Sequence, residues 1–155
     1  MVAVAPEETI HTIHLVKERK IAAPVDLVFE AVLAELGPES EMPGGEPFPM
    51  VFEAWPGGRW YRDLGNNSGH YWGHVQVIKP PTLLEICGPL FMSYPAISHV
   101  QYRLVAEGDT TLLKMTHRAM GLITAEHAEG VHMGWDVGIN QIVKIAERLK
   151  RERNA

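Results

Sequence analysis

The chain has 155 residues, of which 46% are hydrophobic and 21% charged, and its net charge is −5. This length fits one domain around a single core, so we expect one domain over residues 1–155, and the composition is that of an ordinary globular protein. The acidic balance, with no basic stripe along the chain, argues against a nucleic-acid partner.

The first third of the chain predicts a strand, a helix and a loop. Residues 12–21 alternate apolar and polar side chains, which is typical of a strand. Between Pro24 and Gly37 the apolar residues recur at spacings of three and four, which predicts a helix, with Pro24 at its first position. Residues 39–49 are rich in proline, glycine and acidic residues and predict a loop.

The middle of the chain predicts strands joined by tight turns. Alternating or β-branched segments are separated by Gly-Gly, Gly-Asn-Asn-Ser-Gly, Pro-Pro and Glu-Gly-Asp turns. The predicted strands cover residues 50–55, 59–64, 70–78, 82–87, 97–105 and 110–120.

From Thr124 onward the helical period returns. The apolar stripe of this long segment consists of Val131, Trp135, Gly138, Ile142, Ile145 and Leu149. A curved antiparallel sheet must bury such a helix against its concave face. We therefore expect an α+β fold with about six to seven strands wrapped around the C-terminal helix, a short helix after the first strand, and a core over about residues 12–150.

The histidines do not predict a metal site. His127 and His132 are five positions apart, which places them ~140° apart on a helix, so they cannot share one ion. His70 and His74 lie opposite the apolar residues of their strand and should face solvent. His117 alternates with apolar residues and should point inward, and His127 lies at the inner edge of its helix, so the pair could anchor a ligand.

Other reactive motifs are missing from the sequence. It has no nucleophile elbow, phosphate-binding glycine loop, dinucleotide fingerprint or Cys-x-x-Cys pair, so we nominate no catalytic residue, cofactor or metal. The single cysteine, Cys87, suits a reducing compartment. We see no signal peptide and no apolar run near the ~18 residues of a membrane span. The expected location is the cytoplasm.

Five segments, in order along the chain, resemble one family. Residues 21–33 (IAAPVDLVFEAVL) resemble the helix entry of START-like, or SRPBCC, helix-grip domains, which include the birch-pollen allergen. The segments PGGRWYRD, GHYWGHVQVIKPPTLLEI, VQYRLVAEGDTTLLKMTH and GWDVGINQIVKIAERL resemble the heat-shock protein 90 ATPase activator-like branch. One departure is the segment after the first helix, residues 37–50, which lacks the tryptophans common there and should border the cavity mouth.

The resemblance implies the helix-grip fold and three candidate functions. The first is binding of a small hydrophobic or amphipathic ligand between the sheet and the C-terminal helix. The predicted lining residues are Trp60, Tyr71, Val75, Tyr102, Met115, His117, His127, Val131, Trp135 and Gly138. The second is an interaction protein that modulates a chaperone or another ATPase. The third is a cyclase or dehydratase with His117 or His127 as general base. Ligand identity, protein partner and oligomeric state stay open.

Gly138 poses a separate question. A glycine inside a helix costs about 1 kcal/mol relative to alanine, so its place on the inward stripe needs a reason. Either the sheet approaches the helix closely there, or the missing side chain leaves space for a ligand beside Trp135.

Overall fold

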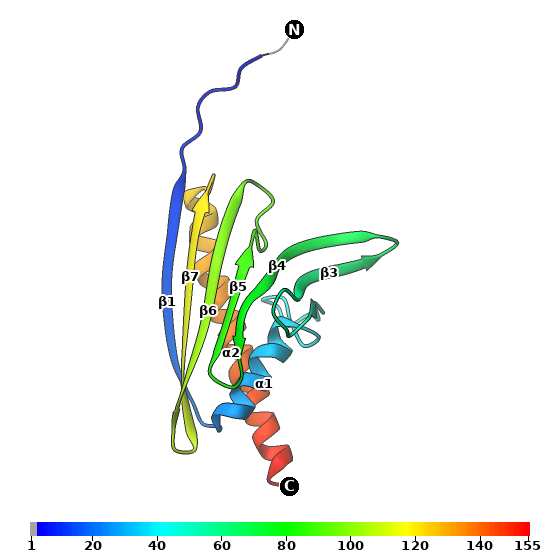
Figure 1. Cartoon of the computed structure of the whole chain (residues 1–155), viewed down its shortest axis with the longest axis vertical. Coiled ribbons are helices and arrows are strands. Elements are labelled where there is room, and N and C mark those ends of the chain that lie inside the picture. Colours follow the sequence, from blue (N-terminus) through cyan, green and yellow to red (C-terminus); the bar gives the residue numbers. More distant parts are fainter. Residues whose placement is uncertain (1–2) are drawn as a thin grey trace.

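The computed structural model describes residues 3–155, which form a seven-stranded antiparallel sheet and two helices (Figure 1). This confirms the predicted α+β class. The elements in chain order are β1 (His11–Ile21), α1 (Val25–Leu36), β2 (Val51–Phe52), β3 (Arg59–Gly65), β4 (Ser68–Lys79), β5 (Leu83–Gly88), β6 (Ala96–Glu107), β7 (Thr110–Gly121) and α2 (Ala125–Arg153).

The sheet is ordered β1-β7-β6-β5-β4-β3-β2. Strands β2 to β7 follow one another as hairpins, and β1 joins at the far edge by pairing antiparallel with β7. In Figure 1 the β3–β4 hairpin swings away from the plane of β1, β7 and β6, so the sheet curves strongly. This curvature creates the concave face on which both helices lie.

Helix α2 covers the concave face with one buried stripe. Thr124 caps its first turn, because the Thr124 hydroxyl accepts a hydrogen bond from the amide of His127 at 3.1 Å. Helix α1 lies against α2, where Asp26 pairs with Arg153 at 2.7 Å, and Glu39, just after α1, pairs with Arg148 at 2.6 Å. Within residues 3–155, neither helix combines the length and apolar character of a membrane span. The buried residues of α2 are Val131, Trp135, Ile139, Ile142, Ile145 and Ala146.

Most element boundaries lie within two residues of the sequence prediction, and two of the differences have a structural cause. Pro24 is the N-cap of α1 with an extended backbone, and Val25 is the first helical residue. The strand predicted over residues 50–55 is only Val51–Phe52. It ends early because the Glu53 carboxylate accepts hydrogen bonds from the Arg59 backbone amide and guanidinium, which folds the intervening residues into a turn.

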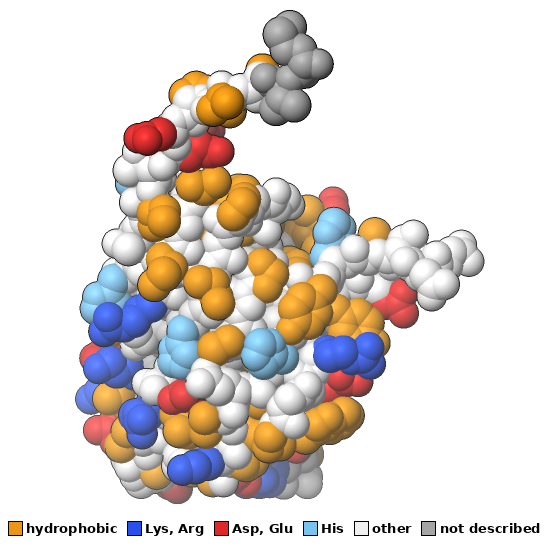
Figure 2. All heavy atoms as spheres, turned by 45° about the horizontal axis from the view of Figure 1, so that its top comes forward, with side chains coloured by type: hydrophobic (Ala, Val, Ile, Leu, Met, Phe, Trp, Pro, Cys, Tyr) orange, Lys and Arg blue, Asp and Glu red, His pale blue; other side chains and the backbone are white. Residues whose placement is uncertain are grey.

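The outer face of the sheet carries a mixed surface (Figure 2). Figure 2 shows apolar side chains between the histidines and charged residues there. Ile97 on β6 and its pairing partner Met120 on β7 are each 58% exposed. His70 and His74 are exposed, as predicted. His99 also faces outward, where its ring lies 3.5 Å from Glu85.

Strands β4 and β5 approach each other closely at a pair of glycines. Gly88 has a φ of +152°, and a Cβ on it would lie 2.5 Å from the Gly73 Cα and 2.5 Å from the Trp72 carbonyl oxygen. Just beyond, the Leu90 amide donates a hydrogen bond to that same carbonyl at 2.7 Å. The backbone around Trp72 is therefore held in place from β5, and only glycine fits at position 88.

We expect Gly88→Ala to lower the free energy of unfolding by about 3 kcal/mol or more, because the added methyl meets backbone atoms that cannot move aside. Gly108→Ala is the matched control, since Gly108 also has a positive φ, +66°, but nothing lies within 4 Å of its added Cβ. That control should cost only about 1 kcal/mol. Urea denaturation measures both, and equal losses would contradict the close-approach explanation.

Candidate functional site

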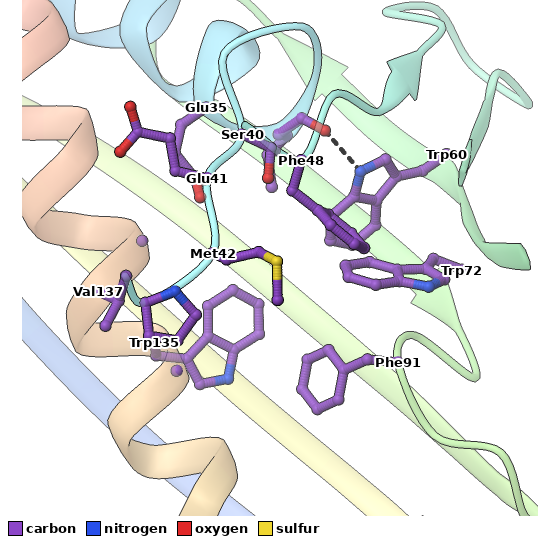
Figure 3. A pocket seen from close by; sticks show the side chains of 14 residues that line it. Glu35, Ser40, Glu41, Met42, Phe48, Trp60, Trp72, Phe91, Trp135 and Val137 are labelled. Carbon is purple, nitrogen blue, oxygen red and sulfur yellow. Dashed lines mark hydrogen bonds between the residues drawn. The ribbon is translucent and has the colours of Figure 1, made fainter. Parts of the chain in front are cut away.

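A cavity of about 280 Å³ lies between α2 and the half of the sheet formed by β3 and β4 (Figure 3). The end of α1 and the loop after it close the cavity from the side, so the segment 37–50 borders it, as predicted. Residues from four regions line the cavity: Glu35, Leu36, Ser40, Glu41, Met42, Pro43, Phe48, Trp60, Trp72, Phe91, Gly134, Trp135, Val137 and Gly138.

Five aromatic rings form most of the apolar wall. Trp72 is at their centre, with its ring centroid 5.1 Å from Trp60, 6.1 Å from Phe48 and 5.7 Å from Phe91. Phe91 in turn lies 6.3 Å from Trp135 on the opposite side. The Phe48 and Trp72 rings are tilted by 34°, and the other three pairs have the favourable edge-to-face arrangement. The wall is therefore a connected aromatic cluster contributed by strands, loops and α2.

Trp60 also fixes the end of α1. Its indole N–H donates a hydrogen bond of 2.7 Å to the carbonyl of Leu36, the last residue of the helix (Figure 3). Trp60 is only 3% exposed, so this bond is shielded from water. The C-terminal carbonyls of a helix lack partners within the helix, and this bond satisfies one of them.

A β-bulge at Trp72 changes which side chains face the cavity. Trp60 pairs with Gly73 and Tyr61 with Tyr71, so Trp72 is an extra residue in β4. The predicted inward position of Tyr71 is wrong: Tyr71 is 49% exposed on the outer face, where its hydroxyl bonds to His74. The alternation that predicted it is broken by the bulge, and Trp72 takes the place at the cavity wall.

Glu35 is the one acidic side chain deep in this site. It is partly buried, and burial raises the pKa of its carboxyl to about 8. Among the described residues, no hydrogen bond or opposite charge offsets that effect. No side-chain nitrogen or oxygen in residues 3–155 is both fully covered and unpaired, so the Glu35 oxygens keep contact with free space. Glu35 therefore presents a largely neutral carboxyl to the cavity at neutral pH.

The space above Gly138 is taken by Glu35. A Cβ on Gly138 would lie 3.0 Å from a Glu35 carboxyl oxygen, and the sheet does not approach there. Figure 3 shows the Glu35 carboxyl pointing toward α2, on whose near side Val137 and Trp135 lie. Gly138 thus gives room to a carboxyl group of α1 at the edge of the cavity.

His117 is fully buried and both of its ring nitrogens are engaged. The Trp135 indole N–H donates to Nδ1 at 2.9 Å, and Nε2 lies 3.0 Å from the Ser98 hydroxyl. Because an indole can only donate, Nδ1 carries no proton and Nε2–H donates to Ser98. Burial lowers the pKa of His117 to about 4, in agreement with this neutral form. The inward direction predicted for His117 is confirmed.

Four of the predicted lining residues lie in the packed core and do not border the cavity. Each is at most 3% exposed, and all belong to the continuous apolar core. Burial, and after it the charge of Glu35, raise the pKa of the Tyr102 hydroxyl well above its usual value. The free space therefore lies nearer β3 and β4 than predicted. The packed residues are Val75, Tyr102, Met115 and Val131.

His127 lies beside the cavity, outside its lining. Its Nδ1 is hydrogen-bonded to the Tyr94 hydroxyl, and its ring centroid lies 6.1 Å from that of Phe91. His132 points elsewhere and contacts Lys17 at 2.8 Å, so the two histidines face different surroundings, as their spacing predicted. Within residues 3–155, no three histidine, cysteine or acidic side chains are grouped to hold a metal ion.

Two residues of the site, Glu35 and Trp72, were not predicted from the sequence. Glu35 follows Val28 and Val32 by seven and three positions, so the helical period already places a carboxyl on the buried stripe. That signal was present in the sequence. Trp72 had no such signal, because its direction depends on a bulge that no local pattern marks.

Comparisons with known proteins place this architecture in a family. A family model described as Activator of Hsp90 ATPase homolog 1-like protein matches residues 22–147. No curated protein matches the sequence.

Solved structures similar to this one are distant in sequence. A Rhizobium leguminosarum protein is 19% identical with a TM-score of 0.73, and the match covers 92% of this chain and 99% of that one. CalU16 from Micromonospora echinospora is 22% identical, with a TM-score of 0.61 and coverages of 95% and 92%. The Zhui aromatase/cyclase from Streptomyces sp. R1128 is 18% identical, with a TM-score of 0.62 and coverages of 89% and 95%. These likenesses confirm the helix-grip fold.

We expect the stability of the protein to fall with rising pH because of Glu35. Its pKa is raised from 4.5 in the unfolded chain to about 8 in the fold, so its contribution is complete below about pH 4.5 and is lost as pH rises through about 8. In the Glu35→Gln variant this pH-dependent loss of stability is absent, because the amide does not ionise. The variant should gain about 4 kcal/mol relative to the parent between about pH 5 and about pH 8.5.

Urea denaturation at several pH values measures this difference. Glu30→Gln, on the exposed side of the same helix, controls for the loss of one carboxylate. A parent and a Glu35→Gln variant with parallel pH profiles would show that the Glu35 carboxyl is hydrated in solution.

Proposed function

Because the chain belongs to the Activator of Hsp90 ATPase homolog 1-like family, we propose that it binds a small apolar molecule in the cavity between β3, β4 and α2. The observation that carries this proposal is the aromatic cluster around a cavity of about 280 Å³. Protein interiors are normally packed at high density, so an aromatic-walled cavity of this size is suited to binding a ligand.

The lining supports a compact ligand with an apolar body. Aromatic walls of this kind bury flat or cyclic molecules well, and the volume is at the lower end of small-molecule pockets. Trp60, Trp135 and Gly138 of the originally predicted set border the cavity. The other members of that set are buried in the core or lie outside the cavity lining, so we place the ligand nearer to Trp72 and Phe91.

The cyclase or dehydratase alternative receives less support from the histidines. His117 is neutral and engaged at both nitrogens, so it has no free lone pair with which to take a substrate proton. His127 is bonded to Tyr94 outside the lining. The similar Zhui protein is an aromatase/cyclase, but at 18% identity that likeness concerns the fold alone.

Filling the cavity should weaken binding without unfolding the protein. Gly134 lines the cavity, and nothing lies within 4 Å of a Cβ placed on it, so Gly134→Leu projects an apolar side chain into the free space. We expect the affinity for the neutral probe 2-naphthylmethanol, measured by isothermal titration calorimetry, to fall at least about tenfold.

The matched control is Gly130→Leu, four residues earlier on the same helix, where there is also open space but no contact with this cavity. It should bind the probe like the parent. A parent protein that does not bind the probe, or equal binding by both variants, would overturn the proposal. A chaperone cofactor would act through its surface, so Gly134→Leu would leave such an activity unchanged.

A further inference from the structure

The charged side chains that line the cavity are both acidic. Glu35 lies at the α1–α2 end and Glu41 in the loop at the side, and the lining includes no lysine, arginine or histidine. Glu41 is exposed, whereas Glu35 is partly buried. The electrostatic character of the site therefore disfavours an anionic ligand and favours a cationic one.

The aromatic rings add to the same preference. Their faces carry negative partial charge, which attracts ammonium groups, and tryptophan does so most strongly. Trp60, Trp72 and Trp135 all border the cavity. A cation in this space would therefore lie near three indole rings as well as a carboxyl group.

The Glu35 carboxyl is suited to pairing with a polar group of a ligand. It is the polar group deep in an otherwise apolar site, and Gly138 leaves room for its carboxyl at the cavity edge. No cation or hydrogen-bond donor among residues 3–155 compensates it. Burying a carboxyl without a partner is costly, so a ligand that supplies the partner recovers that cost on binding.

We propose that the ligand is a hydrophobic amine, whose apolar body lies among the aromatic rings and whose ammonium group pairs with the Glu35 carboxylate. This inference rests on the proposed ligand-binding function and specifies its chemistry. It distinguishes an amine from two other amphipathic classes: neutral alcohols, which gain no ion pair, and carboxylic acids, whose charge the acidic lining repels.

Binding at neutral pH then involves one proton. The free protein holds Glu35 mainly as the neutral acid, and an alkylamine in water is already an ammonium ion. When the ammonium group binds, Glu35 releases its proton to solvent and the carboxylate–ammonium pair forms. Below the pKa of Glu35, about 8, the affinity should therefore fall about tenfold for each pH unit.

The pH dependence of amine binding is expected to come from Glu35 and not from the groups around it. Tyr102 on β6 stays a neutral phenol, because its pKa is raised well above its usual value. Helix α2 presents Gly138 and Val137 at this place, and neither titrates. Glu41 belongs to the exposed loop, and the nearby Glu39 is paired with Arg148.

The experiment uses three probes with one naphthalene body: 2-naphthylmethylamine, 2-naphthylmethanol and 2-naphthoate. Calorimetry with the full chain at about pH 8 should give an affinity for the amine at least about tenfold above that for the alcohol, with the carboxylate weakest. The advantage of the amine should shrink about tenfold between about pH 7 and about pH 6, while alcohol binding stays constant.

Glu35→Gln should remove both the amine preference and its pH dependence and keep the affinity for the alcohol. Glu30→Gln, on the exposed side of the same helix and outside the cavity lining, is the matched control and should keep the preference. If Glu41→Gln, and not Glu35→Gln, removed the preference, the assignment to Glu35 would be wrong. Equal binding of all three probes would overturn the amine proposal and leave the cavity function standing, whereas no binding of any probe would overturn both.

Discussion

The packing of α2 against the concave face of the sheet is the constraint on which the other features depend. A 29-residue helix with one buried stripe needs a sheet that curves around it, and β1, β7 and β6 provide the closely packed half of that surface. The buried Trp135–His117–Ser98 chain of hydrogen bonds fixes α2 to this half. Where β3 and β4 curve away, the helix keeps its direction, and the cavity occupies the remaining space.

The sequence was sufficient for the elements because their patterns are local. Alternation marked every long strand, and the spacing of Val131, Trp135 and Ile142 marked the buried side of α2. The site was only partly predictable, because two of its features are not local. The bulge at Trp72 reverses the alternation that pointed to Tyr71, and the close approach of β4 and β5 that holds it is a long-range contact.

Glu35 was predictable in position and not in environment. The helical period places it on the buried side of α1, yet its pKa depends on how closely α2 and the loop surround it. Likewise, the period singled out Gly138 without indicating that a carboxyl from another helix fills the space above it. Such a group lowers stability at neutral pH and above, and costs of this kind concentrate at functional sites.

The distribution of tryptophans gives the molecule a built-in optical signal. Trp60, Trp72 and Trp135 border the cavity, and of the four tryptophans in the chain only Trp55 lies outside it. With their ring centroids 5.1 Å apart, Trp60 and Trp72 are close enough for their excited states to couple. Near-ultraviolet circular dichroism and emission of the unlabelled protein thus report mainly on one small region, and any occupant of that region changes the spectrum without an added chromophore.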